Sequence, residues 1–249
     1  MKYIFFIFFS CIFFPAFSKQ LLNIAVASNF YEPMKLIKIK FENKFDIKTN
    51  IVKGSSSQLY AQIVNGAPLD IFLSADQKTP RKLDKKLIVP GTQFTYAIGK
   101  LAFWTSINSS KKKDIIHFLK ENKVGVLAIA NPKLSPYGQA SKEFLENIGV
   151  WRQLKNKIVL ATNINQVVTF LYSGNAGCGF ISYSDIKKFK SFNKGHFLNV
   201  PEKFLSTLKQ DGVLLSKSKN ITFSKIFLKY LKSVEARNII KSFGYQISK

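Results

Sequence analysis

The chain has 249 residues and a hydrophobic content of 46%, which is enough to bury one sizeable core or two modest ones and excludes a disordered or collagen-like protein. Its 38 Lys and Arg residues against 14 Asp and Glu residues give a formal charge of +24, a balance that by itself suggests nucleic acid or an anionic membrane as a partner. The lysines are nevertheless scattered along nearly every expected helix and loop, without an Arg-rich tail or a basic stripe interleaved with aromatics. We therefore expect no nucleic-acid partner, and only a secondary role of the positive field in attracting anions.

The first 18 residues have the pattern of a secretory signal peptide. Lys2 precedes an apolar run rich in Phe and Ile, and Ala16-Phe17-Ser18 supplies the small residues that signal peptidase requires. An uncleaved membrane anchor is the alternative, but the run is shorter than the roughly 20 residues of a spanning helix. We expect cleavage near Ser18 and a periplasmic mature protein.

From Leu21 onward, short apolar runs alternate with amphipathic segments, which is typical of βα units on a mainly parallel sheet. Residues 22–27 are expected to form a strand, and Asn29 with Glu32 a capping box for a helix with apolar positions Met34, Ile37, Phe41 and Phe45. A second strand is expected at residues 49–52 and a third at residues 69–73. Between them, the segment GSSSQLYAQIVNG predicts a helix that stops at Gly66.

Residues 94–104 read as one long extended segment with Gly99 in its middle, after which the βα rhythm starts again. Strands are expected at 124–130, 158–161, 179–182 and 212–215, and helices at 136–147, 163–172, 223–233 and 234–243. The restart predicts an α/β protein of two lobes, each a mainly parallel sheet flanked by helices. Lobe I comprises residues 19–98 and 210–249, and lobe II residues 99–209, with chain crossings near 97–101 and 200–209.

Four strand-to-helix junctions end a strand with small or hydroxyl residues and open a helix, namely 27–29, 54–57, 135–138 and 162–165. Ligands of open α/β sheets bind at the carboxyl ends of strands, where the following helices point unpaired N–H groups. Such groups suit an anion held without a formal counter-charge. At any one junction an ordinary helix N-cap is the simpler interpretation. The triplet Ser55-Ser56-Ser57 exceeds what a cap needs, since one hydroxyl suffices.

Other chemistry has little support in the sequence. Cys11 leaves with the signal, so Cys178 is expected to be a lone core thiol, and neither His117 nor His196 has the spacing of a metal ligand. The S-x-x-K matches at Ser110, Ser184 and Ser216 arise by chance in so lysine-rich a chain, and no nucleophile-elbow, phosphate-loop, dinucleotide or zinc-protease motif occurs. We expect no catalytic activity, no free-cation site and no cofactor.

The segments AVASNFYEPMK, GSSSQLYAQIVNGAPLDIFLSADQ, ANPKLSPYGQASKEFLENIGVW and GNAGCGFISYSDI resemble, in order and spacing, the successive motifs of the periplasmic molybdate-binding proteins. The resemblance runs from about Asn23 to about Asp185, with the final SFGY also similar, and GAPLDIFLSADQ is its most specific part. It implies the two-lobed fold of the type II periplasmic binding proteins and a solute-binding subunit of an ABC importer. The implied ligand is a tetrahedral oxyanion, molybdate or tungstate, and the implied partners are a membrane permease and an ATPase. We expect a monomer.

Carried over by position, the resemblance implies an oxyanion held between the lobes by Ser28, Asn29, Ser56, Tyr137 and Ile164, the last through its backbone N–H. One branch of the family has a tyrosine after the GFV-like strand, where this chain has Ser182 and then Tyr183. Because a one-residue offset reverses the facing of a strand residue, Tyr183 is left out of the site and Tyr137 is expected to compensate. Two alternatives stay open at this stage. One is another solute on the same fold, such as sulfate, phosphate or ferric iron held by Tyr137 and Tyr183, and the other is a basic exported protein that binds polyanions.

Overall fold

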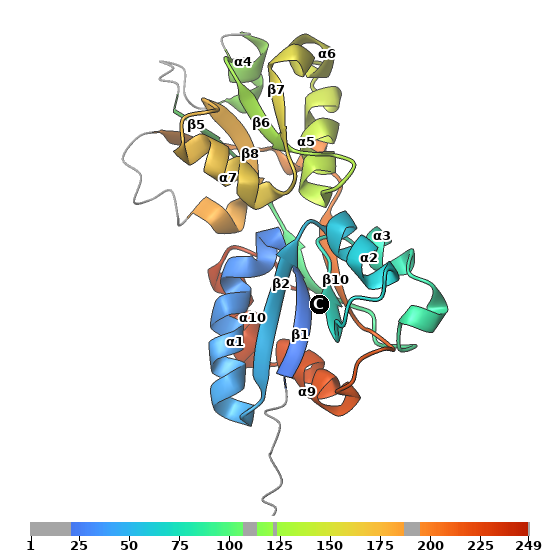
Figure 1. Cartoon of the computed structure of the whole chain (residues 1–249). Coiled ribbons are helices and arrows are strands. Elements are labelled where there is room, and N and C mark those ends of the chain that lie inside the picture. Colours follow the sequence, from blue (N-terminus) through green and yellow to red (C-terminus); the bar gives the residue numbers. More distant parts are fainter. Residues whose placement is uncertain (1–20, 107–113, 122–123, 187–194, 249) are drawn as a thin grey trace, which may run out of the picture.

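The computed structural model describes residues 21–106, 114–121, 124–186 and 195–248, and it shows two mixed five-stranded sheets one above the other (Figure 1). The strand orders are β2-β1-β3-β10-β4 and β7-β6-β8-β5-β9. We call the first sheet with its helices lobe I and the second lobe II. The expected signal peptide and Cys11 lie outside the described residues.

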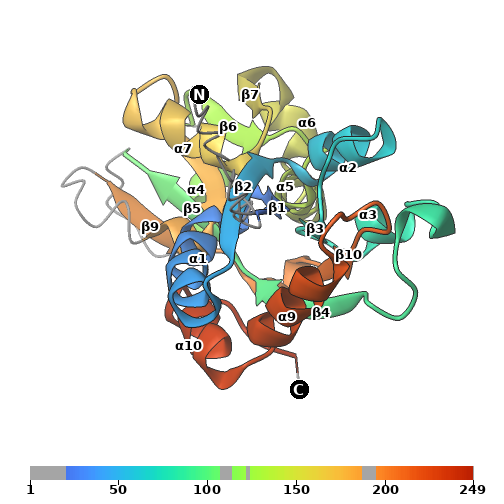
Figure 2. The ribbon, with the colours of Figure 1, turned by 60° about the horizontal axis from the view of Figure 1, so that its bottom comes forward.

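In lobe I, β1 (Leu21–Ala27) pairs in parallel with β2 (Lys48–Gly54) and β3 (Ile71–Leu73), while β10 (Leu208–Leu214) runs antiparallel to β3 and to β4 (Phe94–Gly99). Because successive strand residues face opposite sides, Ile24 and Val26 pack on one side and Ala25 on the other. The first side is covered by α1 (Tyr31–Phe45), α9 (Ile221–Leu231) and α10 (Val234–Ser242), and the second by α2 (Ser56–Val64) and α3 (Lys78–Arg81) (Figure 2).

In lobe II, β6 (Leu127–Ala130) pairs in parallel with β7 (Ile158–Ala161) and β8 (Cys178–Ser182). β5 (Leu101–Thr105) is antiparallel to β8 and to β9 (His196–Asn199). The helices are α4 (Ile115–Lys120), α5 (Pro136–Asn147), α6 (Trp151–Leu154) and α7 (Ile164–Tyr172), and one hydrophobic core joins them to the sheet. The expected α/β class with two lobes of mainly parallel strands flanked by helices is confirmed.

The chain passes between the sheets twice. The segment 94–104, expected as one extended run, is divided between the two sheets, since β4 ends at Gly99 in lobe I and β5 begins at Leu101 in lobe II. The return path runs from the end of β9 through the short helix η5 (Glu202–Phe204) into β10. Figure 1 shows the carboxyl ends of β1 and β2 facing lobe II, so the junctions that follow these strands lie at the boundary between the lobes.

The capping box expected between Asn29 and Glu32 is wrong. A 3-10 turn, η1 (Ser28–Phe30), follows β1, and α1 begins after Phe30 without any side-chain cap. A capping box forms instead at the start of α2, where the Ser55 hydroxyl accepts from the backbone N–H of Gln58 and the Gln58 side chain accepts from that of Ser55. The Asn29 side chain is held by distant partners described below.

Two of the remaining expectations concern single residues. Cys178 is fully buried in β8, and this burial raises the pKa of its thiol to about 12, so it stays protonated and packs as a small apolar group. His117 lies on α4, where its Nε2 atom is 2.7 Å from Glu121 Oε1. No helix in the described part of the chain is both long and apolar enough to cross a bilayer.

Candidate functional site

The four strand-to-helix junctions meet where the lobes touch. The backbone N–H of Ser57 in lobe I donates to the carbonyl of Leu134 in lobe II at 3.2 Å, which joins the second junction to the third. The turn η1 packs against α7, which joins the first junction to the fourth. Ala27 and Ala75, at the ends of lobe I strands, pack into the hydrophobic core of lobe II. The junctions therefore form one surface shared by both lobes.

At three of these junctions the capping side chain leaves one backbone N–H group near the start of the helix unused. In α2 the Ser55 hydroxyl accepts from the backbone N–H of Gln58, and in α5 the Ser135 hydroxyl accepts from that of Gly138. In α7 the side-chain oxygen of Asn163 accepts from the backbone N–H groups of Asn165 and Gln166. Within the described residues, the structure shows no protein acceptor for the N–H groups of Ser56, Tyr137 and Ile164. Unpaired N–H groups at the positive end of a helix dipole are donors for an anion.

All five residues carried over from the family resemblance are nearly inaccessible to solvent. Their exposed fractions are 4% for Ser28, 2% for Asn29, 1% for Ser56, 0% for Tyr137 and 1% for Ile164. A ligand among them is shielded from water, which strengthens its interaction with polar donors.

The three serines of the triplet have different partners. Ser55 caps α2, and the Ser57 hydroxyl lies 3.4 Å from the carbonyl of Lys133 at the edge of lobe II. The Ser56 hydroxyl oxygen accepts the backbone N–H of Ala75 at 3.0 Å. Because this bond uses only a lone pair of Ser56, its hydroxyl proton is left to donate to a ligand.

Tyr137 presents a neutral phenol. Its hydroxyl oxygen lies 3.2 Å from Gln210 Nε2 and 3.4 Å from the hydroxyl of Ser182. Burial raises the pKa of Tyr137 well above its usual value. The phenol therefore keeps its proton at physiological pH, which is the form that can donate to an anion.

The Asn29 side chain is occupied within the protein. Its Nδ2 atom donates to Gln210 Oε1 at 2.9 Å and to the Tyr245 hydroxyl at 3.1 Å, and the Tyr245 hydroxyl donates in return to the Asn29 carbonyl at 2.8 Å. Burial raises the pKa of Tyr245 to about 12, so this phenol also keeps its proton. With both amide hydrogens used, the group that Asn29 can offer to a ligand is its backbone N–H.

Several residues of this buried network were not expected from the sequence, namely Tyr96, Ser184, Gln210 and Tyr245. The Ser184 hydroxyl lies 2.8 Å from that of Ser182 and donates to the Asn29 carbonyl at 3.0 Å, so the network connects β8 of lobe II to η1 of lobe I. The partners of Asn29 are 181 and 216 residues away in the sequence. The resemblance of the final SFGY segment was the only signal that pointed to one of them, Tyr245.

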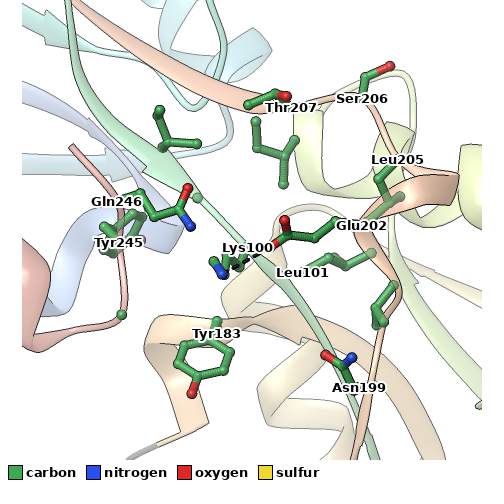
Figure 3. A pocket seen from close by; sticks show the side chains of 15 residues that line it. Lys100, Leu101, Tyr183, Asn199, Glu202, Leu205, Ser206, Thr207, Tyr245 and Gln246 are labelled. Carbon is green, nitrogen blue, oxygen red and sulfur yellow. Dashed lines mark ion pairs between the residues drawn. The ribbon is translucent and has the colours of Figure 1, made fainter. Parts of the chain in front are cut away.

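The Tyr183 side chain lines a different part of the structure from the five residues. Its side chain is 45% exposed, and its ring covers Gly244, where a Cβ atom would come within 2.3 Å of it. It lines a cavity of about 540 Å³ at the two crossings, together with the ion pair between Lys100 and Glu202 at 2.9 Å (Figure 3). None of the five residues lines this cavity. Tyr137 thus does not line the cavity that Tyr183 lines, and no three His, Cys, Asp or Glu side chains cluster as metal ligands in the described ranges.

Comparisons with known proteins identify the family of the chain. The family model of the bacterial extracellular solute-binding proteins matches residues 22–246. The chain is 39% identical to the molybdate-binding protein ModA of Azotobacter vinelandii, over 90% of this chain and 89% of that relative. It is also 39% identical to the molybdate-binding protein ModA of Rhodobacter capsulatus, over 89% of this chain and 86% of that relative. Among solved structures, the periplasmic molybdate-binding protein of Azotobacter vinelandii superposes with a TM-score of 0.85 at 32% identity, covering 92% of this chain and all of the other.

Proposed function

The chain belongs to the bacterial extracellular solute-binding proteins and, within them, to the group of the molybdate-binding proteins, and from this premise we propose that it binds molybdate or tungstate between its lobes. Proteins of this kind are transport components and not enzymes. We further propose that the mature protein is a periplasmic monomer, released by cleavage near Ser18, that delivers its ligand to the permease and ATPase of an ABC importer. The periplasmic location follows the family.

The observation that carries the proposal is the set of unpaired donors from both lobes. These donors are all neutral. They are the N–H groups of Ser56, Tyr137 and Ile164, the backbone of the uncapped turn at Ser28 and Asn29, and the hydroxyls of Ser56 and Tyr137. A fully deprotonated tetrahedral dianion offers acceptor oxygens only, so it can use each of these donors without leaving one of its own protons unpaired. Ser28, Asn29, Ser56, Tyr137 and Ile164 are thus our proposed ligand-binding residues.

Calorimetric titration of the purified protein tests the ligand directly. We expect molybdate and tungstate to bind one per chain and to raise the melting temperature in a concentration-dependent way, with sulfate and phosphate much weaker. Added salt should change this affinity little, because the site is buried, whereas binding of a polyanion to the surface lysines would weaken steeply with salt. Tighter binding of sulfate or phosphate, or salt-sensitive polyanion binding without molybdate binding, would contradict the proposal.

Replacing Ser56 with alanine is expected to weaken molybdate binding by about 1 to 3 kcal/mol, roughly fivefold to 150-fold in Kd, because a hydrogen bond to a charged oxygen is lost. Ser57→Ala is the matched control, since the Ser57 hydroxyl contacts the Lys133 carbonyl instead. Its Kd should stay within about twofold of the wild type. Equal Kd values for the wild type and Ser56→Ala would remove this hydroxyl from the site.

A further inference from the structure

The second crossing carries a buried polar side chain that joins the lobes beside the proposed site. Gln210 is the third residue of β10 and is fully buried. The pairing of β10 with β4 shifts register between Gln210 and Asp211. Such bulges change the direction of side chains along a strand.

The carboxamide of Gln210 has partners in both lobes. Its oxygen accepts from Asn29 Nδ2 at 2.9 Å and lies 3.1 Å from the Tyr96 hydroxyl, both in lobe I. Its nitrogen donates to the Tyr137 hydroxyl of lobe II at 3.2 Å. One side chain therefore contacts two of the five proposed ligand-binding residues.

This contact fixes the direction of the Tyr137 proton. An amide nitrogen donates and does not accept, so the phenol oxygen must accept from Gln210 and its single proton must point elsewhere. The other neighbour of the oxygen is the Ser182 hydroxyl at the longer distance of 3.4 Å, and Ser182 is itself 2.8 Å from the Ser184 hydroxyl. We propose that Gln210 is a positioning residue of the oxyanion site, which turns the phenolic proton of Tyr137 toward the bound ligand. This inference rests on the proposed function.

The first crossing leaves room for this contact. A Cβ atom on Gly99 would lie 2.1 Å from the Tyr137 hydroxyl oxygen and 2.5 Å from Gln210 Nε2. The two polar groups thus meet over the one residue of the crossing that has no side chain. The hydrogen bond between them forms only when β4, β10 and α5 approach each other.

A double-mutant cycle tests the role of Gln210 with molybdate as the ligand. Gln210→Met keeps the length of the side chain but cannot donate, and Tyr137→Phe removes the phenolic proton. We expect each single variant to raise Kd by about tenfold or more, and the double variant to stay within about threefold of Tyr137→Phe, because Gln210 acts through Tyr137. Gln139→Met, on the exposed face of α5, controls for the change of residue type and should leave Kd unchanged.

The pH dependence of molybdate binding by Gln210→Glu provides a second test, which can be carried out even if Gln210→Met does not fold. An ionised Glu would accept a hydrogen bond from the Tyr137 phenol, so the phenolic proton would point away from the ligand. Burial raises the pKa of a carboxyl group, so lowering the pH from about 8 to about 5 should protonate it, restore a donor and recover at least about tenfold in Kd relative to the wild type. The recovery should be lost in the double variant Gln210→Glu/Tyr137→Phe, whereas a purely structural role, or direct repulsion of the anion by the carboxylate, predicts that it persists there.

The outcomes separate the two proposals. Three results would overturn the positioning role in a wild type that binds molybdate. The effects of the Gln210 and Tyr137 substitutions on Kd could multiply in the double variant, or Gln210→Met could bind molybdate like the wild type. The third such result is a Kd of Gln210→Glu that does not change with pH. If the wild type binds no oxyanion at all, the proposed function fails, and this inference fails with it.

Discussion

Gly99→Ala is expected to weaken molybdate binding by about 2 to 4 kcal/mol, or roughly 30-fold to 1000-fold in Kd. The new methyl group would lie 2.1 Å from the Tyr137 hydroxyl oxygen and 2.5 Å from Gln210 Nε2, well inside contact distance. Both side chains are fully buried, so neither can move without breaking hydrogen bonds between the lobes. Calorimetric titration measures the loss.

The lobes can relieve this clash by separating, so the effect on folding should be smaller than the effect on binding. Small-angle scattering of Gly99→Ala with excess molybdate should show a larger radius of gyration than that of the liganded wild type. Gly125→Ala is the control, because within the described residues no atom outside its two chain neighbours lies within 4 Å of a Cβ atom at that position. A Kd within about twofold of the wild type for Gly99→Ala would mean that the Tyr137 hydroxyl does not contribute to binding.

Gly138→Ala is expected to destabilise the protein by about 3 kcal/mol, a fall of about 6 to 12 °C in melting temperature. Its Cβ atom would lie 2.2 Å from the carbonyl oxygen of Ala130, and 2.7 and 2.8 Å from the carbonyl carbons of Ala130 and Asn131. These are backbone atoms at the end of β6, so they cannot rotate away. Alanine would otherwise favour the helix by about 1 kcal/mol, and the clash outweighs that gain.

Thermal unfolding of Gly138→Ala in the absence of ligand measures this effect, again with Gly125→Ala as the control. The close approach of α5 to β6 is also what brings the first turn of α5, and with it Tyr137, to the lobe boundary. An unchanged melting temperature would contradict the close packing described here.

The order and type of most elements could be predicted from the sequence, because each depends on local pattern. The helix at 136–147 and the strand at 158–161 have the expected bounds, since Pro at the first helical position and a short apolar run are strong local signals. The crossing expected near 97–101 already divides 94–104 between two lobes, but the partner strands of its two halves could not be predicted. Strand propensity does not specify which partner strand each half will find.

The proposed site could likewise be predicted only where it depends on local pattern. Its helix starts are visible in the sequence as small and hydroxyl residues, but the side chains that hold them in place come from far away. Asn29 illustrates this, because the local pattern with Glu32 predicts a cap, whereas Gln210 and Tyr245 take its amide hydrogens instead. Tertiary hydrogen bonds to buried partners outweigh a local cap at this helix start.

The near-complete burial of the five proposed ligand-binding residues has a kinetic consequence for an ion bound among them. An ion held there would leave only after the contacts between the lobes break. Its residence time would then be limited by how often the hydrogen bond from the Ser57 amide to the Leu134 carbonyl, and the lobe contacts around it, open together. Ligands of different affinity that share this enclosure should then show the same upper limit on their dissociation rates. A transporter that pulls the lobes apart would shorten that residence time without touching the ion.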